Sequence, residues 1–200
     1  MRNKVLVAML ATAGLLSAPV VQAEEGVFMV RARALYVDFS NGQNSLPAGA
    51  RVEADNRWIP EVDLSYFITP NIAAELVLTY PQSVDVNLNG NKLGSVRALP
   101  PSLLLQYHVT ELGAFKPYVG AGLNYTIFSS RSVGGVARVD SSSLGLAAQV
   151  GADYMLDKNW GINVDLKYIQ MDTKVKVGVS SIGTLDLNPI TVGAGVTYRF

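Results

Sequence analysis

The amino-acid sequence predicts an all-β protein, an eight-stranded antiparallel transmembrane β-barrel, and three observations lead to that prediction. First, only 16% of the 200 residues are charged and 18 are glycine, yet the one long apolar run lies at the very start of the chain. Second, the last stretch, Leu185 to Phe200, alternates between apolar and small or polar residues and ends on an aromatic residue. Third, seven earlier segments alternate in the same sense, as strands between lipid and a lumen must.

Residues 1–23 have the three parts of a secretory signal peptide. Arg2 and Lys4 form the basic start, residues 5–16 the apolar centre, and Val-Gln-Ala at 21–23 the small-residue cleavage site. The alternative, a membrane anchor, is disfavoured because the apolar run is shorter than the ~20 residues that a spanning helix needs. We therefore expect a signal peptide over 1–23 and an exported barrel over 24–200.

Eight segments are predicted as strands because apolar side chains alternate in them with small or polar ones. The predicted strands are Phe28–Phe39, Trp58–Phe67, Ile72–Tyr80, Ser102–Val109, Lys116–Ser129, Ser142–Leu156, one that starts at Trp160, and the closing strand within Leu185–Phe200. Long polar loops alternate with short turns between them. The long loops are predicted over Asn41–Arg57, Pro81–Pro101, Ser130–Ser141 and near Val179–Thr184, with a small hairpin around Asn89-Gly90.

This layout also predicts the orientation of the barrel. An even number of antiparallel strands with short turns on one rim is typical of outer-membrane barrels, and those turns face the periplasm. Both ends of the mature chain would then lie on the periplasmic side, with the long loops outside the cell.

The distribution of charge separates a membrane barrel from a soluble one. A soluble barrel of the lipocalin type carries polar residues outside and apolar residues inside. Here the outward positions lack charge, and the charged residues fall on inward positions. These residues are Arg31, Arg33, Glu61, Asp63, Glu75, Lys116, Asp153, Asp165, Lys167 and Arg199. Tyrosine and tryptophan gather toward both ends of the strands, as the two aromatic girdles of a membrane barrel do.

Five segments, in this order and spacing, resemble the OmpW family of outer-membrane proteins. They are VRARALYV, PEVDLSYFITPNIAAELVLTYP, VRALPPSLLLQYHV, FKPYVGAGLNYTIF and LDLNPITVGAGVTYRF. The resemblance covers nearly all of the mature chain, and Asn41–Arg57 matches it least clearly. It implies a narrow barrel in the cell outer membrane, surrounded by outer-membrane lipids, with a proposed role in passing small hydrophobic molecules. It also implies that Phe200 presents the chain end to the barrel assembly machinery.

The inward residues separate by height into two predicted layers. The predicted lumen floor, near the periplasm, carries mostly charges that should pair, because an unpaired buried charge is costly. Its members are Arg31, Arg33, Asp63, Glu75, His108, Lys116, Asp153, Asp165 and Arg199. The upper lumen is apolar, and we call this set the apolar cup. Its members are Leu35, Val37, Phe39, Ile59, Val77, Leu104, Phe128, Ile169, Met171 and Leu187.

The two layers predict a conduit for hydrophobic molecules that enter from outside and cannot continue straight down. Pro60 and Pro189 lack an N–H group, so they could weaken the strand ladder and allow a lateral exit into the membrane. The alternative is that both prolines lie at bulges or strand ends. The floor itself has a simpler interpretation as side chains that fill a narrow barrel.

Other classes of function find less support in the sequence. Sixteen basic and sixteen acidic residues leave no basic field for nucleic acid. No metal-ligand spacing, phosphate loop or dinucleotide fingerprint is present, so no cofactor is expected. The one histidine, His108, lies ~20 Å along its strand from Ser102, too far for a nucleophile and its base, so we expect no enzyme. A structural or adhesive barrel that acts through its extracellular loops remains the alternative.

Overall fold

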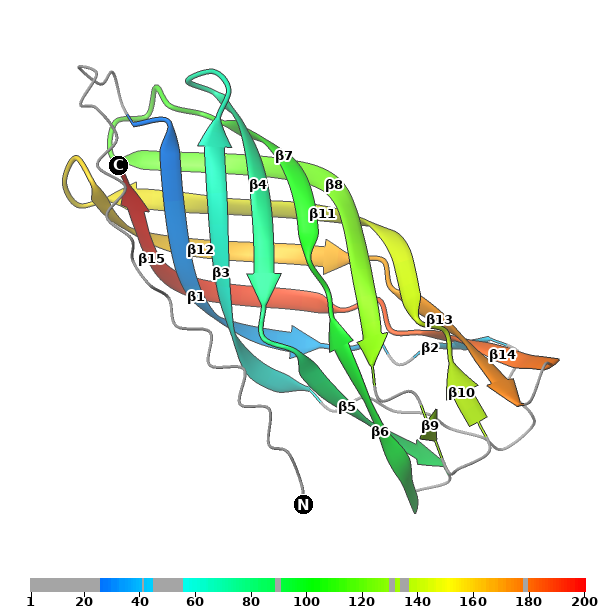
Figure 1. The fold of residues 1–200 in the computed structure, drawn as a ribbon. Helices are drawn as coiled ribbons and strands as arrows, with labels where there is room; N and C mark the ends of the chain where they lie inside the picture. The colour runs from blue at the N-terminus through cyan, green and yellow to red at the C-terminus, as the bar shows by residue number, and fades with distance from the viewer. Residues whose placement is uncertain are drawn as a thin grey trace, which may run out of the picture.

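Eight antiparallel strands close into a barrel in the computed structural model, which describes residues 26–40, 42–44, 56–88, 91–129, 132–133, 137–177 and 180–200 (Figure 1). In order around the wall they are β1 (Phe28–Asp38), β3 (Arg57–Phe67), β4 (Ile72–Thr79), β7 (Ser102–His108), β8 (Phe115–Ser129), β11 (Ser142–Met155), β12 (Trp160–Ile169) and β15 (Ile190–Arg199). Pairing of β1 with β15, the first and last strands, closes the ring. The predicted fold class is confirmed. The predicted signal peptide lies outside the described residues.

The barrel turns its apolar side chains outward and its charges inward. Along β1, Arg31 and Arg33 are buried while Ala32 and Ala34, which follow them in alternation, are exposed. The antiparallel registers preserve this alternation, since inward Arg33 lies opposite inward Glu61 on β3. The exposed outer wall is rich in leucine, valine, isoleucine and tyrosine. Such a continuous apolar surface is typical of a lipid-facing barrel wall and unusual on a protein in water.

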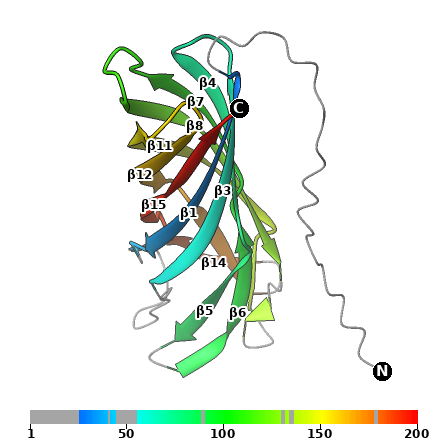
Figure 2. The same ribbon diagram turned by 90° about the vertical axis from the view of Figure 1, so that its left-hand side faces the viewer.

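Short turns and the C-terminus lie at one end of the barrel (Figures 1 and 2). In the β11–β12 turn, the Asp157 carboxylate accepts backbone N–H groups of Asn159 and Trp160 at 2.8 and 2.7 Å. These bonds hold the pKa of Asp157 below its usual value. At the same end the Phe200 amide donates to the Phe28 carbonyl at 3.0 Å. The end of the chain is thereby fixed to the first strand.

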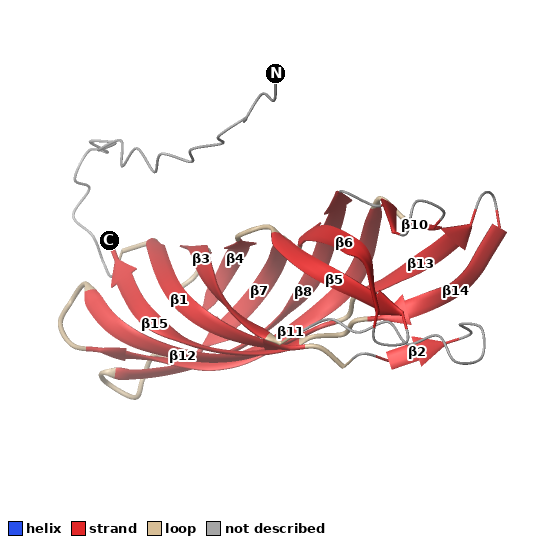
Figure 3. Ribbon diagram, turned by 90° about the horizontal axis from the view of Figure 1, so that it is seen from below, coloured by secondary structure: helices blue, strands red, loops and turns tan. Residues whose placement is uncertain are grey.

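The opposite end contains seven further strands, and all but β13 (Asp172–Val177) lie wholly or partly where the sequence predicts loops (Figure 3). A hairpin of β5 (Gln82–Leu88) and β6 (Asn91–Leu99) pairs with β8, which extends the predicted small hairpin around Asn89-Gly90. A second sheet has the order β2 (Gly42–Asn44), β14 (Ser180–Asp186), β13 (Asp172–Val177), β10 (Ala137–Val139) and β9 (Ser132–Val133). The prediction of loops is therefore wrong for β2, β9, β10 and most of β14, and the predicted hairpin is longer than expected.

The end of the chain also departs from the prediction of one continuous closing strand. Leu185 belongs to β14, and β15 begins only at Ile190. Both differences have the same physical reason. A strand that projects beyond the bilayer satisfies its backbone hydrogen bonds without needing an apolar face, so the periodicity that marks a membrane strand is weak there. None of the described residues forms a helix long and apolar enough to cross a bilayer.

Candidate functional site

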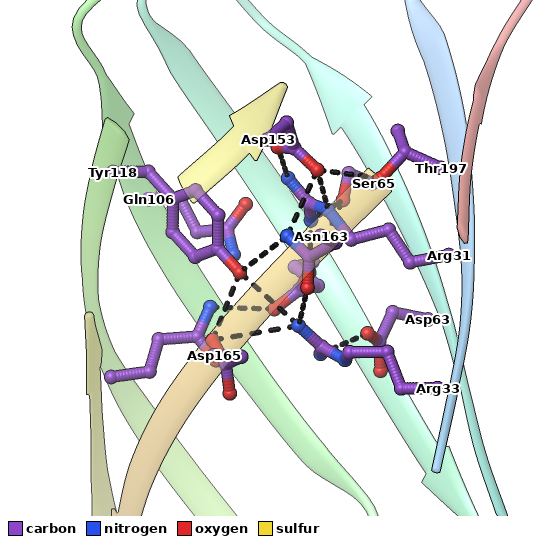
Figure 4. Close-up of polar contacts among 12 residues, drawn as sticks. Arg31, Arg33, Asp63, Ser65, Gln106, Tyr118, Asp153, Asn163, Asp165 and Thr197 are labelled. Atoms are coloured by element: carbon purple, nitrogen blue, oxygen red, sulfur yellow. Dashed lines mark hydrogen bonds and ion pairs between the residues drawn. The ribbon is translucent and has the colours of Figure 1, made fainter. Parts of the chain in front are cut away.

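The lower half of the lumen contains a buried network of charges, which we call the ion-pair layer (Figure 4). Its members are Arg31, Arg33, Glu61, Asp63, Glu75, Asp153, Asp165 and Lys167. Arg31 lies at one centre of it. Its guanidinium donates to Asp153 at 2.7 and 3.1 Å and to Glu75 at 2.7 Å, so that β1, β11 and β4 are linked across the lumen.

Arg33, two residues after Arg31 on β1, forms the second centre of the ion-pair layer. Its guanidinium contacts Glu61 at 2.8 Å and donates to Asp63, the two carboxylates carried by β3. Nη1 of the same guanidinium donates to Asn163 Oδ1 at 2.9 Å and to the Tyr118 hydroxyl at 3.1 Å. Arg33 therefore connects β1 and β3 to β8 and β12, and its charge is surrounded by acceptors.

Lys167 and Tyr118 complete the layer from the far side of the barrel. Lys167 Nζ, on β12, reaches Glu61 Oε2 on β3 at 3.1 Å. The Tyr118 hydroxyl donates to Asp165 at 2.9 Å, and Gln149 donates to Glu75 at 2.7 Å. Because these side chains meet across the lumen, they leave no apolar route through the layer.

The predicted lumen floor divides into two groups in the structure. Arg31, Arg33, Asp63, Glu75, Asp153 and Asp165 belong to the ion-pair layer. Three others lie nearer the end of the barrel that carries the short turns. The His108 ring lies between the rings of Phe67 and Tyr118 in tilted arrangements, with centroid distances of 4.9 and 5.1 Å. Lys116 donates to the Thr110 carbonyl at 2.9 Å, and the Arg199 guanidinium lies 4.2 Å over the Phe67 ring.

Sequence reasoning placed Glu61 and Lys167 on inward positions but did not assign them to the floor, and it overlooked Tyr118. The sequence signal that could have indicated all three residues is their inward-facing position in the strand alternation. Parity gives the face of a strand, but it does not give the neighbours across the lumen, because strand tilt and stagger decide which heights meet. The Lys167–Glu61 contact, which joins positions 106 residues apart, depends on that stagger.

Above the ion-pair layer, the apolar cup surrounds a cavity. All ten residues of the cup are buried, and they form one contiguous cluster with Val96, Ala98 and Ala147. Seven of them line the cavity: Leu35, Val37, Phe39, Ile59, Val77, Ile169 and Met171. The cavity itself has a volume of about 40 Å³, within a wider region of about 580 Å³ free of protein atoms that includes open solvent. Leu104, Phe128 and Leu187 pack in the same cluster without lining the cavity.

One part of the wall beside the cavity is not closed by a strand ladder. Pairing of β3 with β4 ends at Glu61 and Thr79, although β3 continues up to Arg57. On its other edge β3 remains paired to β1 as far as Arg57. Among the described strands, β5, which follows β4, pairs only with β6. Pro60 lies directly above the last β3–β4 pair, where the ladder is interrupted.

Pro189 has a different environment, directly before the start of β15 and in an unchanged register with the opposite chain. Its carbonyl accepts the Ile169 amide at 3.0 Å, and the Leu187 amide donates to Met171 at 2.8 Å. Asn188 has a positive φ of 26°, and its side-chain oxygen accepts the Met171 amide at 2.9 Å. The β12 edge is therefore continuous past Pro189. For this proline the structure supports the alternative interpretation, a strand end, because Pro189 directly precedes Ile190, the first residue of β15.

Ser102 and His108 have separate partners. His108 Nε2 lies 3.0 Å from Gln106 Oε1, and the Ser102 hydroxyl accepts from Asn124 at 3.0 Å. The two side chains do not form a nucleophile–base pair. Within the described part of the chain, no group of three or more His, Cys, Asp or Glu residues is placed to hold a metal ion.

Comparison with known proteins identifies the family. The model of the OmpW family matches residues 24–200. The chain belongs to the OmpW family. The chain is 44% identical to the uncharacterized outer-membrane protein y4mB of Sinorhizobium fredii, covering 95% of this chain and 90% of that protein. Outer membrane protein W of Vibrio cholerae is 34% identical, over 94% of this chain and 95% of that protein.

A solved structure and a more distant relative extend this comparison. The crystal structure of OprG from Pseudomonas aeruginosa superposes with a TM-score of 0.78 at 27% identity, covering 88% of this chain and 97% of that one. The dibenzothiophene metabolism operon protein PahQ of Pseudomonas aeruginosa is 27% identical over 81% of this chain and 80% of that protein. This OmpW-family chain is therefore an outer-membrane barrel, and the predicted family and location are confirmed.

Proposed function

We propose that this OmpW-family barrel passes small hydrophobic molecules across the outer membrane, taking them from outside into the apolar cup and releasing them sideways through the wall. The observation that carries the proposal is the cavity lined by seven apolar side chains directly above the ion-pair layer. Burial of apolar surface in such a cavity is favourable by roughly 25 cal/mol per Å². Binding there needs no specific polar recognition of the cargo.

A straight path to the periplasm is unfavourable for the same molecules. An apolar solute in the ion-pair layer would separate Arg31 from Asp153 or Arg33 from Glu61, and each separated buried pair costs about 3–5 kcal/mol. It would offer no hydrogen bonds in return. The wall above Thr79 presents a smaller obstacle, because no β3–β5 ladder has to open there among the described strands. We therefore assign the exit to the wall beside Pro60.

One relative supports the class of cargo. The name of PahQ places that protein in an operon of dibenzothiophene metabolism. Dibenzothiophene is a small, rigid and largely apolar aromatic molecule. A cargo of that class would match a cavity with apolar walls, and by similarity we propose small hydrophobic molecules for this chain.

Charge placed in the cup tests the entry step. We expect Leu35→Asp or Ile169→Asp to reduce uptake of a labelled hydrophobic compound by intact cells roughly tenfold or more, because an ionised carboxylate disfavours apolar ligands beside it. Leu35→Met, which keeps volume and polarity, is the matched control and should leave uptake unchanged. Membrane levels and the mobility of the folded barrel on gels verify assembly. Unchanged uptake by assembled Asp variants would refute the apolar route.

A reversible cross-link tests the exit step. The natural chain contains no cysteine, so Pro60→Cys with Tyr80→Cys would introduce a single disulfide above the last β3–β4 pair. We expect oxidation to suppress uptake and reduction to restore it. The control is Leu64→Cys with Leu76→Cys, which joins the same two strands where they are already paired. If the locked barrel takes up cargo at the normal rate, lateral exit at this position is wrong, while the cup remains open to its own test.

The alternative function, a structural or adhesive barrel, has one observation in its favour. The five-stranded sheet of β2, β14, β13, β10 and β9 gives the outer end an ordered framework of its own. A structural barrel would, however, be expected to fill its upper lumen completely with interlocking side chains, whereas the cup leaves an apolar cavity of about 40 Å³. Replacing residues 137–139 and 173–185 with short turns separates the two functions: a conduit retains uptake, and an adhesive barrel loses its surface activity.

A further inference from the structure

The cavity in the apolar cup is too small to hold a molecule of the class proposed as its cargo. Its volume of about 40 Å³ is well below the ~150 Å³ of an apolar protein cavity that holds one benzene molecule. Packed protein interiors do not deform continuously, so the cup has to enlarge by the movement of a whole element of its wall. The pairing of the strands indicates which element this is.

Most of the wall around the cup is held by long strand ladders. β1 pairs with β3 from Phe28 to Val37 and with β15 from Met29 to Asp38. β12 pairs with β15 along its whole length except for its last residue, Ile169. Separating the strands of any of these ladders would break a row of backbone hydrogen bonds at once. These parts of the wall are therefore fixed.

The β5–β6 hairpin, which projects beyond the ends of β4 and β7, is joined to the barrel less firmly (Figure 2). β6 pairs with β8 only from Arg97 to Leu99. Among the described strands, β5 pairs only with β6, so its other edge forms no ladder with β3. Pro81 and Pro100, which have no N–H group to donate, lie where the hairpin joins the wall. The hairpin can therefore turn at its short junction with β8 without breaking a long ladder.

The same hairpin covers the cup. Val96 and Ala98 of β6 are buried and belong to one apolar cluster with the cup residues. Ala98 and its register partner Gln82, on β5, both line the cavity. A movement of the hairpin away from β3 would therefore have two effects. It would enlarge the cavity, and it would widen the break in the wall beside Pro60.

The Arg57 side chain joins the hairpin to the fixed part of the wall. Its Nη1 donates to the backbone carbonyl of Ser83 on β5. Arg57 is itself held in the β1–β3 ladder opposite Val37, and it lines the cavity. A hydrogen bond from a guanidinium is charge-assisted and roughly twice as strong as one between neutral groups. At this edge of β5 it takes the place of a strand ladder, and a single bond can break and form again.

We infer that the β5–β6 hairpin is a hinged lid over the apolar cup and that Arg57 keeps this lid closed. When Arg57 is bonded to Ser83, the cup retains its small cavity. When the bond breaks, the lid turns at its junction with β8, the cavity enlarges and the wall opens beside Pro60. This inference rests on the proposed function of the cup and specifies what regulates its lateral exit. Arg57 is a positioning residue, since it acts by holding the lid.

Distances between spin labels on the whole barrel in lipid nanodiscs test the lid. The natural chain has no cysteine, so Ser83→Cys and Leu64→Cys place one label on the lid and one on the paired part of β3, both at exposed positions. The Ser83 carbonyl remains in place. We expect Arg57→Met to raise the population of a longer label distance about tenfold, because the bond that it removes is charge-assisted. Labels at Leu64 and Leu105, both on the wall, are the matched control pair and should keep their distance.

Further variants assign the effect to the hydrogen bond. Uptake of a labelled hydrophobic compound by intact cells should rise in Arg57→Met and in the shorter Arg57→Gln. Arg57→Lys retains a cationic donor and should restore most of the closed population. Arg97→Met, which removes the same charge from an exposed position on the lid, is the matched control and should change neither distance nor uptake. Mobility of the folded barrel on gels verifies assembly.

Three results would overturn the lid. They are natural label distances in both Arg57→Met and Arg57→Gln, equal opening in Arg97→Met, and a longer distance without any rise in uptake while Leu35→Asp still abolishes it. Failure of the lid is also distinguishable from failure of the conduit. If the disulfide between Pro60→Cys and Tyr80→Cys blocks uptake while Arg57→Met changes nothing, the lateral exit is retained and the lid is rejected. If Arg57→Met lengthens the distance while Leu35→Asp leaves uptake unchanged, the lid movement is retained and the apolar route is rejected.

Discussion

The ion-pair layer and the apolar cup occupy inward positions of the same strands but are built in opposite ways. In the ion-pair layer, Arg31 and Arg33 each bind side chains from several strands, so every neighbour fixes another. In the cup, the side chains of Leu35, Ile59 and Ile169 end at a cavity. In the ion-pair layer, directional hydrogen bonds and ion pairs define a single arrangement of the side chains. In the cup, non-directional apolar contacts can adapt to ligands of different shape. In the proposed conduit, the rigid ion-pair layer blocks the lumen and the apolar cup holds the hydrophobic molecule.

The largest expected effect comes from breaking the rigid half. Arg31→Met should lower the free energy of unfolding by about 3–5 kcal/mol, because it leaves Glu75 and Asp153 buried without their cation. Urea unfolding of the barrel in lipid vesicles measures the change. Lys158→Met, on an exposed turn, is the control and should stay within about 0.5 kcal/mol. Adding Glu75→Gln and Asp153→Asn should recover part of the loss; no recovery would mean that Arg31 acts through packing.

A second, intermediate effect separates the two kinds of position within the cup. Leu35→Ala and Leu104→Ala each remove the same atoms from one buried cluster and should each cost about 2–4 kcal/mol. Only Leu35 lines the cavity, so only Leu35→Ala should shift uptake toward bulkier hydrophobic compounds. Competition between a linear and a polycyclic compound in intact cells measures the preference. The same shift in both variants would show that the cavity is not the receptacle.

The sequence was sufficient to predict which residues face the lumen, but not which of them meet or how they interact. The alternation in segments such as Phe28–Phe39 predicts the inward face, because a membrane wall permits only one parity. Contacts such as Lys167–Glu61 depend on the stagger of the strands, which no single segment contains. The interrupted β3–β4 ladder and the continuous backbone hydrogen bonding at Pro189 likewise depend on neighbours. Pro60 and Pro189 therefore look alike in the sequence, because both lack an N–H group, although the strand ladder is interrupted beside Pro60 only.

The smallest expected effect probes the boundary between the halves, where the cup meets the ion-pair layer. Thr191→Val should raise the free energy of unfolding by about 1 kcal/mol, because it removes a buried hydroxyl that has no partner. Thr126→Val should lower it by about 1 kcal/mol, because the Thr126 hydroxyl donates to Asn124 at 2.6 Å. The opposite signs of two identical substitutions, measured side by side by urea unfolding, provide the test. Destabilisation by both would mean that Thr191 has a partner in the folded barrel and belongs to the rigid half.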